Sequence, residues 1–416
     1  MPKRRTRTEE AAMENIEIVV VGGGYAGVMA ANRLTLREGV RVTVVNPRET
    51  FVERIRLHQL VGGSDDAVVA YREVLAEGVR LVVDAVDRID AAGRCVELAS
   101  GLRLGYDHLV YAVGSGSTAT GVPGVDEFAR PLATLEEADR LRSVLLDTPR
   151  SAPVTVVGSG PLGLETATEL AEEGRSVTLV CGGELGPYLH RRGRRSVARR
   201  MAALGVTVLD GPGSRAAEVT ADLVRLEDGR EVPSEVTVWT AGFGVPDLAA
   251  RSGLSTDAMG RLLTDETLTS VDDPRIVAAG DCAAPSDLPL RMSCQSAIPL
   301  GAQAADTVLG RIDGKEPATL NQTFVGQCIS LGRAAGIVQF SRRNDVAVWL
   351  HLGGRPGAKV KEYVCVGTVK YLSGEARKPG SYRLHKVPGT PERKRLLRSR
   401  SEDGQTAASA SVEHTV

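Results

Sequence analysis

Two segments of the sequence each place a glycine-rich turn between an apolar run and a helical pattern, and they constrain the fold more than any other feature. They are IEIVVVGGGYAG at 16–27 and VTVVGSGPLGLE at 154–165. Each helix is followed by another apolar strand, VRVTVVN and SVTLV respectively. One such unit is weak evidence, but two, with first glycines Gly22 and Gly158 lying 136 residues apart, predict a doubly wound α/β protein.

The glycines in such units have separate roles. The first makes the tight turn, the second lets the backbone approach a pyrophosphate, and the third lets helix and strand pack closely. The helix N-terminus adds free N–H groups and the positive end of its dipole. The sequence therefore predicts two dinucleotide sites, the alternative being glycine-rich connections without a ligand. The residues concerned are Gly22, Gly24, Tyr25, Ala26 and Gly27 in the first unit and Gly158, Gly160 and Gly163 in the second.

Composition excludes several other classes of protein. The chain has 51 basic and 52 acidic side chains, so no overall field favours nucleic acid. Its six cysteines form no CxxC and no zinc-like spacing with histidine, which predicts no metal site and reduced thiols. We find no signal peptide, and glycines interrupt the longest apolar run. We expect a cytoplasmic protein, with at most peripheral contact at the inner face of the membrane.

The residue that closes the second strand of each unit usually holds the adenosine ribose. In the first unit this position falls at Asn46, whose amide can bond a hydroxyl although an acid is usual. In the second unit the strand ends in Cys181, with Glu184 a little further on. Four arginines between 191 and 195 can hold a 2′-phosphate or form a solvated helix face. The sequence therefore allows either NADH or NADPH at the second unit.

The order of motifs resembles the two-dinucleotide flavoprotein family that includes type II NADH dehydrogenases, apoptosis-inducing-factor-like reductases and pyridine-nucleotide disulfide reductases. The pieces that carry this resemblance are IEIVVVGGGYAG, YDHLVYAVGS, VTVVGSGPLGLE, VTVWTAGF and RIVAAGDCA. It implies two nested Rossmann-like domains of the glutathione-reductase type and a smaller C-terminal domain. It also implies FAD in the first unit and NADH or NADPH in the second.

We expect the following division of the chain. A disordered leader is followed by a discontinuous FAD domain that encloses the NAD(P)H domain, in which Thr134 and Glu137 form a capping box. Four strand-like segments, TFVGQCISLG, AGIVQF, VAVWLHLGG and KEYVCVGTV, build the last domain. A basic, disordered tail follows. The expected ranges are 1–14, then 15–120 with 265–317, then 121–264, 318–375 and 376–416.

The resemblance also assigns residues outside the two glycine turns. Gly280 and Asp281 would place a carboxylate on the ribityl chain of the flavin. Gly114 would mark the crossover strand, within Ala-Val-Gly where the family usually has Ala-Thr-Gly. Gly242 follows the strand VTVW and would lie beside a nucleotide.

Departures from the family bear on the electron acceptor. Disulfide reductases carry CxxxxC where this chain has FVERIRLHQLVGG, so electrons must leave to a diffusible acceptor. Sulfide:quinone reductases need later cysteines, an option that Cys181, Cys328 and Cys365 leave open. The quinone motif AQxAxQ is matched in part by 302–307, where Gln303 is kept at an expected helix start and can bond the acceptor or the flavin. The family's C-terminal membrane-binding helices are replaced by a strand-like segment and the basic tail, a weak lipid contact at most.

Four residues are candidates for catalysis. Glu165 lies soon after the third glycine of the second unit; the resemblance places it beside the nicotinamide, the alternative being an acid that stabilises the helix dipole. Arg54 and His58 share a face if their segment is helical, and His58 can exchange protons with an acceptor or merely pack. Arg54 can instead pair with Glu53 or a flavin phosphate. The resemblance places the domain of Lys361 over the flavin, where its ammonium can stabilise negative charge; the alternative is a salt bridge with Glu362.

These observations predict an FAD-dependent NAD(P)H oxidoreductase that transfers electrons to a quinone or a similar small acceptor. One alternative is a flavoenzyme that acts on a particular metabolite. A second is a flavin redox sensor or electron-transfer protein with little turnover. Dimers are common in the resembled family, so the chain can also form a homodimer.

Overall fold

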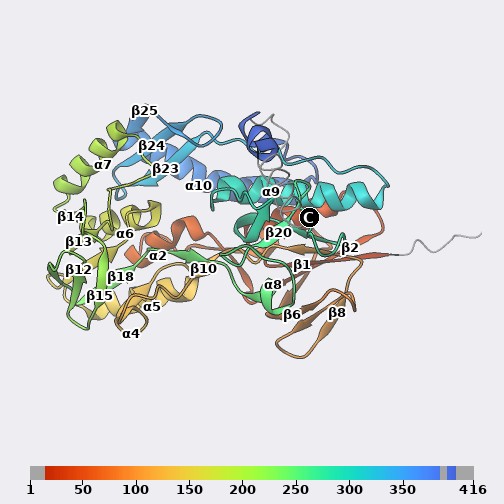
Figure 1. The fold of residues 1–416 in the computed structure, drawn as a ribbon, viewed down its shortest axis with the longest axis horizontal. Coiled ribbons are helices and arrows are strands. Elements are labelled where there is room, and N and C mark those ends of the chain that lie inside the picture. Colours follow the sequence, from red (N-terminus) through yellow and green to blue (C-terminus); the bar gives the residue numbers. More distant parts are fainter. Residues whose placement is uncertain (1–14, 385–390, 400–416) are drawn as a thin grey trace, which may run out of the picture.

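Two five-stranded parallel sheets organise the computed structural model, which describes residues 15–384 and 391–399 (Figure 1). The first sheet consists of β21 (Ile276–Ala278), β9 (His108–Tyr111), β1 (Ile16–Val21), β2 (Val40–Asn46) and β5 (Arg80–Val83), in that spatial order. Every neighbouring pair in it is parallel. The strands read as nearly continuous valine-rich runs because both faces of the sheet are covered.

Different structures cover the two faces of this sheet. On one face, α1 (Tyr25–Leu34) and α9 (Cys294–Ile312) pack against each other and against side chains such as Val20. On the other, Val19 and Val21 pack against a three-stranded antiparallel sheet. That sheet consists of β6 (Val86–Asp90), β7 (Cys95–Leu98) and β8 (Arg103–Gly105). Strands before residue 112 and after residue 275 thus belong to one sheet.

The second sheet repeats this plan within residues 129–239. It consists of β11 (Ala129–Pro131), β18 (Val236–Trp239), β12 (Pro153–Val157), β13 (Ser176–Val180) and β14 (Thr207–Leu209), all parallel. The helices are α5 (Leu135–Asp147), α6 (Pro161–Glu172) and α7 (Arg191–Ala203). The small sheet of β15 (Ala216–Val219), β16 (Leu223–Leu226) and β17 (Glu231–Pro233) packs opposite. The predicted capping box of Thr134 and Glu137 is confirmed at the start of α5.

Short elements join the two halves. β10 (Gly116–Ser117) pairs antiparallel with β19 (Phe243–Gly244) between the sheets. α2 (Leu57–Gly62) belongs to the first half of the chain but packs on α5 and α6 of the second. The remaining elements are β3 (Thr50–Val52), η1 (Arg54–Arg56), β4 (Val68–Ala70), α3 (Tyr71–Val74), α4 (Val125–Phe128), α8 (Leu248–Arg251), β20 (Leu262–Thr264), η2 (Gly280–Cys282) and β22 (Ala283–Pro285).

The C-terminal region contains three of the four predicted strands. They are β23 (Gly326–Ser330), β24 (Gly336–Ser341) and β25 (Ala347–Gly353), which form an antiparallel sheet. The strand predicted for KEYVCVGTV is wrong, because this segment lies inside α10 (Gly354–Arg377). Its valines and Tyr363 suggested a strand, but the buried residues Lys361, Cys365, Thr368 and Leu372 recur every three or four positions. Tertiary packing overrides the β-branched valines.

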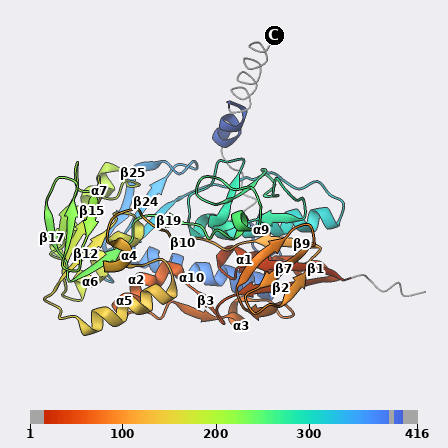
Figure 2. The ribbon, with the colours of Figure 1, turned by 60° about the horizontal axis from the view of Figure 1, so that its bottom comes forward.

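α10 crosses the molecule from β24 to α1 (Figure 2). At its end, Glu375 accepts hydrogen bonds from the N–H groups of Gly380 and Tyr382. Residues 391–399 are helical, and Arg393 pairs with Glu266 at 2.8 Å. The disorder expected from residue 376 is therefore wrong for 376–384 and 391–399, while 385–390, 400–416 and the leader 1–14 lie outside the described residues. Within the described ranges, no helix is long and apolar enough to cross a membrane.

Candidate functional site

The first glycine turn leaves no room for larger residues where its backbone is crowded. Gly22 has φ +104°, and a Cβ there would lie 2.3 Å from a carbonyl oxygen just after β9. A Cβ on Gly27 would lie 1.9 Å from the carbonyl oxygen of Gly22. Gly24, the N-cap of α1, has open space instead, and no side chain caps this helix. The first N–H groups of α1, at Tyr25 and Ala26, thus remain for an anion such as a phosphate.

The second glycine turn has nearly the same geometry. Gly158 has φ +117°, and a Cβ on Gly163 would lie 1.9 Å from the carbonyl oxygen of Gly158. Gly160, the N-cap of α6, again has open space and no capping side chain. Pro161 takes the first helical position, where a missing N–H costs nothing. The structure thus contains two uncapped helix starts whose geometry suits an anion.

The residues that close the second strand of each unit differ in the hydrogen bonds that they make. In the first unit, the Asn46 side chain accepts a hydrogen bond from the N–H of Gly23 at 3.0 Å and donates to the carbonyl oxygen of Arg48 at 2.9 Å. In the second unit, Ser159 donates to the carbonyl oxygens of Cys181 and Glu184 at 3.2 and 3.0 Å. In the first unit, the residue at the strand end, Asn46, therefore stabilises the glycine turn. In the second unit the roles are reversed, because Ser159 of the glycine turn stabilises the strand end.

Asp281 lies where the first sheet meets the segment after β9. Its Oδ2 accepts a hydrogen bond from the hydroxyl of Ser115 at 2.6 Å and lies 3.6 Å from Nη1 of Arg54. Its Oδ1 is buried and has no hydrogen-bond partner. Gly280 and Gly114 have φ of +83° and +73°; a Cβ on Gly280 would lie 3.0 Å from the Cβ of Ala26, whereas the space at Gly114 is open. A buried carboxylate oxygen without a partner fits the hydroxyl of a bound flavin's sugar chain, as the resemblance implied.

Gly242 follows β18 and has φ +76°. It lines a hollow of about 300 Å³ together with Ser117, Thr118, Trp239 and Phe243, at the short β10–β19 junction. This predicted nucleotide-binding glycine therefore lies at the connection between the two halves.

Three titratable side chains from separate segments meet in the interior. The Nζ of Lys361, on α10, lies 2.8 Å from Oε1 of Glu165, on α6. The same oxygen accepts a hydrogen bond from the N–H of Ser330, on β23, at 2.9 Å. The other oxygen of Glu165 lies 3.5 Å from Nδ1 of His58, on α2. All three titratable side chains are buried, and His58 is only 1% exposed.

The environment sets the charge of each of these groups. Burial opposes ionisation of Glu165, but Lys361, His58 and the Ser330 N–H outweigh it and lower the pKa of the carboxyl. Burial likewise opposes the charge of Lys361, and Glu165 more than compensates, so the pKa of the ammonium is raised. Burial dominates at His58, whose pKa is lowered to about 4 despite the nearby carboxylate. At neutral pH the site thus holds an ion pair beside a neutral imidazole.

Several predicted relations are wrong in detail. Arg54 and His58 share no helix, because Arg54 lies in η1 and His58 in α2, and they contact Ser115 and Glu165 respectively. Glu165 is the fifth residue of α6, beyond the first turn, so stabilisation of the helix dipole does not explain it.

Two alternative pairings also do not occur. Lys361 pairs with Glu165 and not with Glu362, which pairs with Arg56 at 2.7 Å. Arg56, and not Arg54, pairs with Glu53.

Gln303 does not lie at a helix start. It is the tenth residue of α9, is buried, and donates a hydrogen bond to the carbonyl oxygen of Ala318 at 2.7 Å. Its amide is therefore committed to the protein backbone. The start of α9 carries Cys294 and Gln295, and Cys294 lies within electrostatic range of both Lys361 and Asp281. Sequence reasoning missed this helix end because the partial motif match pointed eight residues downstream of Gln295.

Cysteines do not form a metal site in the described part of the chain. No group of three or more metal-ligating side chains occurs among the residues that the structure describes. Cys294, Cys328 and Cys365 are free and lie within electrostatic range of Lys361. Burial raises the pKa of each thiol, so all three are protonated at neutral pH.

Two dinucleotide-type turns on parallel sheets, with one buried ionic cluster between the halves, are the architecture of a pyridine-nucleotide-dependent oxidoreductase. The chain belongs to the pyridine nucleotide-disulphide oxidoreductase family, whose model matches residues 16–305. Family membership confirms the predicted fold class and the assignment as an NAD(P)H-dependent oxidoreductase.

Individual relatives agree with this assignment. An NADH dehydrogenase-like protein of Mycobacterium tuberculosis is 29% identical over 351 residues, which cover 77% of this chain and 86% of the relative. The type II NADH:quinone oxidoreductase of the same organism is 27% identical over 410 residues, with coverage of 86% and 88%. The sulfide:quinone oxidoreductase of Aquifex aeolicus superposes with a TM-score of 0.73 at 17% identity, covering 88% of this chain and 93% of the other. This last likeness shows a shared fold.

Proposed function

We propose that the chain binds FAD at the first glycine turn and NADH or NADPH at the second, and transfers electrons to a quinone or a similar small acceptor. When bound, the flavin takes hydride from the nicotinamide and passes electrons on. The unpartnered Oδ1 of Asp281 and the open N-cap of α1 support the flavin position. The open N-cap of α6 supports the nicotinamide nucleotide.

The observation that carries this proposal is the buried ion pair of Glu165 and Lys361 beside His58. A redox-active disulfide of the family type needs a cysteine pair on the His58 segment, and that segment contains none. The carboxylate of Glu165 favours a proton on Nδ1 of His58, which leaves Nε2 as the basic atom. Lys361 supplies a fixed positive charge that electrostatically favours an anion next to it. The cluster can therefore hold charge and move a proton while electrons pass to a diffusible acceptor.

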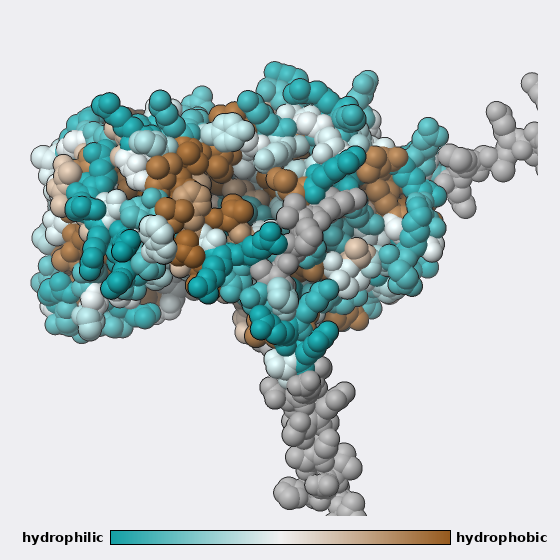
Figure 3. All heavy atoms as spheres, turned by 90° about the horizontal axis from the view of Figure 1, so that it is seen from above, coloured by the Kyte–Doolittle hydropathy of each residue, from teal (hydrophilic) through white to brown (hydrophobic). Residues whose placement is uncertain are grey.

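A lipophilic acceptor also requires an apolar approach, and the surface provides one. Apolar side chains gather on the face of the molecule seen from above (Figure 3). Exposed apolar residues are concentrated on the β23–β25 sheet, its turns and the adjoining α10. They are Val325, Phe340, Val346, Trp349, Leu350, Leu352, Tyr363, Val364 and Val366. Such a surface is suited to contact with a quinone-bearing lipid layer. We therefore propose peripheral membrane contact by this face.

Anaerobic stopped-flow mixing of the flavin-loaded protein tests the proposal. We expect NADH or NADPH to bleach the flavin absorbance, and a soluble quinone to restore it within a turnover time. Bleaching without recovery on addition of quinone would contradict the acceptor and favour a metabolite-specific enzyme or a redox sensor. A purified protein that binds no FAD would contradict the proposal as a whole.

A further inference from the structure

A surface pocket lies at the ends of two neighbouring strands of the second sheet. Gly182 and Gly183 follow β13, and Asp210 to Gly213 follow β14, which pairs with β13 in parallel. The pocket has a volume of about 540 Å³. Ser159 in the glycine turn bonds the carbonyl oxygens of Cys181 and Glu184 and so ties the turn to the pocket's edge. Ligands of such sheets bind beyond the carboxyl ends of the strands, so this pocket suits the adenosine half of the nicotinamide nucleotide.

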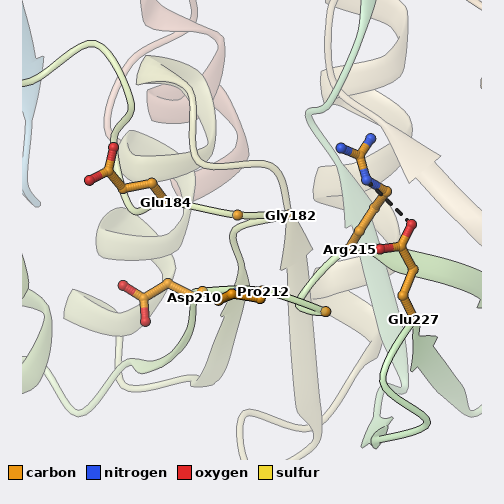
Figure 4. Close-up of a pocket in the computed structure, with 9 residues that line it drawn as sticks. Gly182, Glu184, Asp210, Pro212, Arg215 and Glu227 are labelled. Carbon is orange, nitrogen blue, oxygen red and sulfur yellow. Dashed lines mark ion pairs between the residues drawn. The ribbon is translucent and has the colours of Figure 1, made fainter.

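Carboxylates outnumber cations in this pocket. Its charged lining residues are Glu184, Asp210, Glu227 and Arg215. Glu184 and Asp210 extend to the same side of the Gly182 loop, and the ion pair of Arg215 with Glu227 lies on the other side (Figure 4). Asp210 makes no hydrogen bond or ion pair with any residue that the structure describes. Its carboxylate is therefore available to a ribose hydroxyl.

None of the four arginines between 191 and 195 lines the pocket, and two of them, Arg192 and Arg194, make contacts elsewhere. Arg194 contacts Glu184 and also donates hydrogen bonds to the carbonyl oxygens of Leu185 and Leu189. The guanidinium of Arg192 lies over the ring of Trp349, 5.4 Å from its centroid. A phosphate adds up to two negative charges at neutral pH, and it would enter among carboxylates without an unpaired cation in the lining.

We propose that Asp210 and Glu184 select NADH against NADPH. This inference rests on the proposed use of a nicotinamide nucleotide at the second turn. Both carboxylates accept hydrogen bonds from the adenosine ribose hydroxyls and repel a 2′-phosphate. The ion pair of Glu184 with Arg194 adds a second barrier, because it neutralises the cation that would otherwise attract the phosphate.

Calorimetric titration with adenosine fragments tests the inference without turnover. ADP-ribose and 2′-phospho-ADP-ribose are titrated into the flavin-loaded protein, and rates of flavin bleaching by NADH and NADPH are measured in parallel. We expect ADP-ribose to bind about tenfold or more tightly than its 2′-phosphate form. The double variant Asp210→Asn/Glu184→Ala should lose most of this preference, because it removes the repulsion and frees Arg194. Higher salt should narrow the preference of the unmodified protein.

A matched control is Glu235→Gln, which removes a carboxylate of the same sheet before β18 and thus at the opposite strand ends. It should leave the preference unchanged. Equal or tighter binding of the 2′-phosphate form by the unmodified protein would overturn the inference, as would an unaltered preference in the double variant. Failure of both NADH and NADPH to bleach the flavin would overturn the proposed function itself, a result distinct from bleaching by NADPH alone.

Discussion

The two glycine turns are nearly identical in backbone, yet the chain supports them differently. In both, the third glycine would clash at 1.9 Å with the carbonyl oxygen of the first if it carried a Cβ. In the first unit the turn is enclosed: a Cβ on Gly23 would lie 2.1 Å from the hydroxyl of Tyr71, which donates to the carbonyl oxygen of Gly23. In the second unit, the strand ends open into the surface pocket of Gly182 and Asp210. The two turns thus share the backbone that suits a pyrophosphate, and they differ in how closely other residues enclose them.

This difference teaches how one chain can treat two nucleotides unequally. An enclosed turn suits a group that stays bound, whereas an open pocket suits a co-substrate that must leave after each cycle. The buried cluster draws on both halves, since His58 comes from a segment of the first and Glu165 from the helix of the second turn.

The largest expected effects come from filling the open N-caps. Gly24 and Gly160 have φ of −82° and −68°, and the space that a Cβ would enter is open at both, so neither the backbone nor the Cβ of a valine is strained there. Gly24→Val should weaken FAD binding by about a thousandfold, or ~4 kcal/mol, because its side chain takes the phosphate's place. Gly160→Val should keep FAD and lose binding of the nicotinamide nucleotide to a similar extent. Flavin absorbance and nucleotide titration measure these effects.

The two valine variants act as controls for each other. Circular dichroism of the flavin-free proteins should show unchanged folding in both. If Gly160→Val loses FAD while Gly24→Val retains it, the assignment of the two nucleotides is reversed.

Breaking the ion pair between α6 and α10 should have the next largest effect. Glu165→Gln leaves the ammonium of Lys361 buried without a counter-charge, and we expect a loss of about 3–5 kcal/mol in the free energy of unfolding. Adding Lys361→Met should restore most of this stability, because no unpaired charge remains. Urea unfolding measures both variants. We expect the reduced flavin to be reoxidised slowly in the single variant and also in the double variant. Reoxidation of the double variant at the normal rate would show that the ion pair has a structural role only.

His58 makes stability depend on pH. Its pKa of about 4 in the fold lies below the ordinary 6.5, so the unfolded chain binds the extra proton first as the pH falls. Stability should therefore decrease from pH 6.5 to pH 4, by up to about 3 kcal/mol. His58→Gln should lose this component of the acid sensitivity. The measurement is the free energy of unfolding of both proteins at each pH in that range. If it changed with pH equally in the unmodified protein and in His58→Gln, the neutral, buried imidazole would be contradicted.

The smallest effects concern the strand ends. Asn46→Ala leaves the N–H of Gly23 without its partner, which should cost about 1–2 kcal/mol and speed FAD release. Cys181→Ala removes only a small buried side chain, and should cost about 1 kcal/mol without altering FAD binding. Thermal unfolding and the rate of flavin loss separate these outcomes. Equal rates of flavin loss in both variants would argue against a bracing role for Asn46.

Local patterns were sufficient to predict the two units and most of the C-terminal strands. Strand, glycine and helix signals lie within about thirty residues of one another in each unit, and the capping box depends on two residues of one turn. The fold class follows from such signals alone. Glu165 and Lys361 became candidates through the resemblance to the flavoprotein family and not through these local signals, and their catalytic roles remain predictions.

Long-range pairing could not be read from the sequence. Glu165 and Lys361 meet only because residues 354–377 form a helix that runs from β24 to α1, whereas the valines beside Tyr363 indicated a strand. The partner of Gln303 is a carbonyl oxygen in a connection without regular structure, at Ala318. Such contacts depend on tertiary packing, which leaves no periodic signal in the chain.

The position of α10 also has a consequence for biosynthesis. Asn32 donates a hydrogen bond to the carbonyl oxygen of Leu372, and Arg33 pairs with Glu375 at 3.0 Å, 342 residues further along. At about 5–20 residues per second, a ribosome needs roughly 20–70 s to make that stretch. Until then the polar side chains at the end of α1 lack these partners, whereas the sheet of the second unit is complete once residue 239 has emerged. The unit that is translated first is thus the last to be finished.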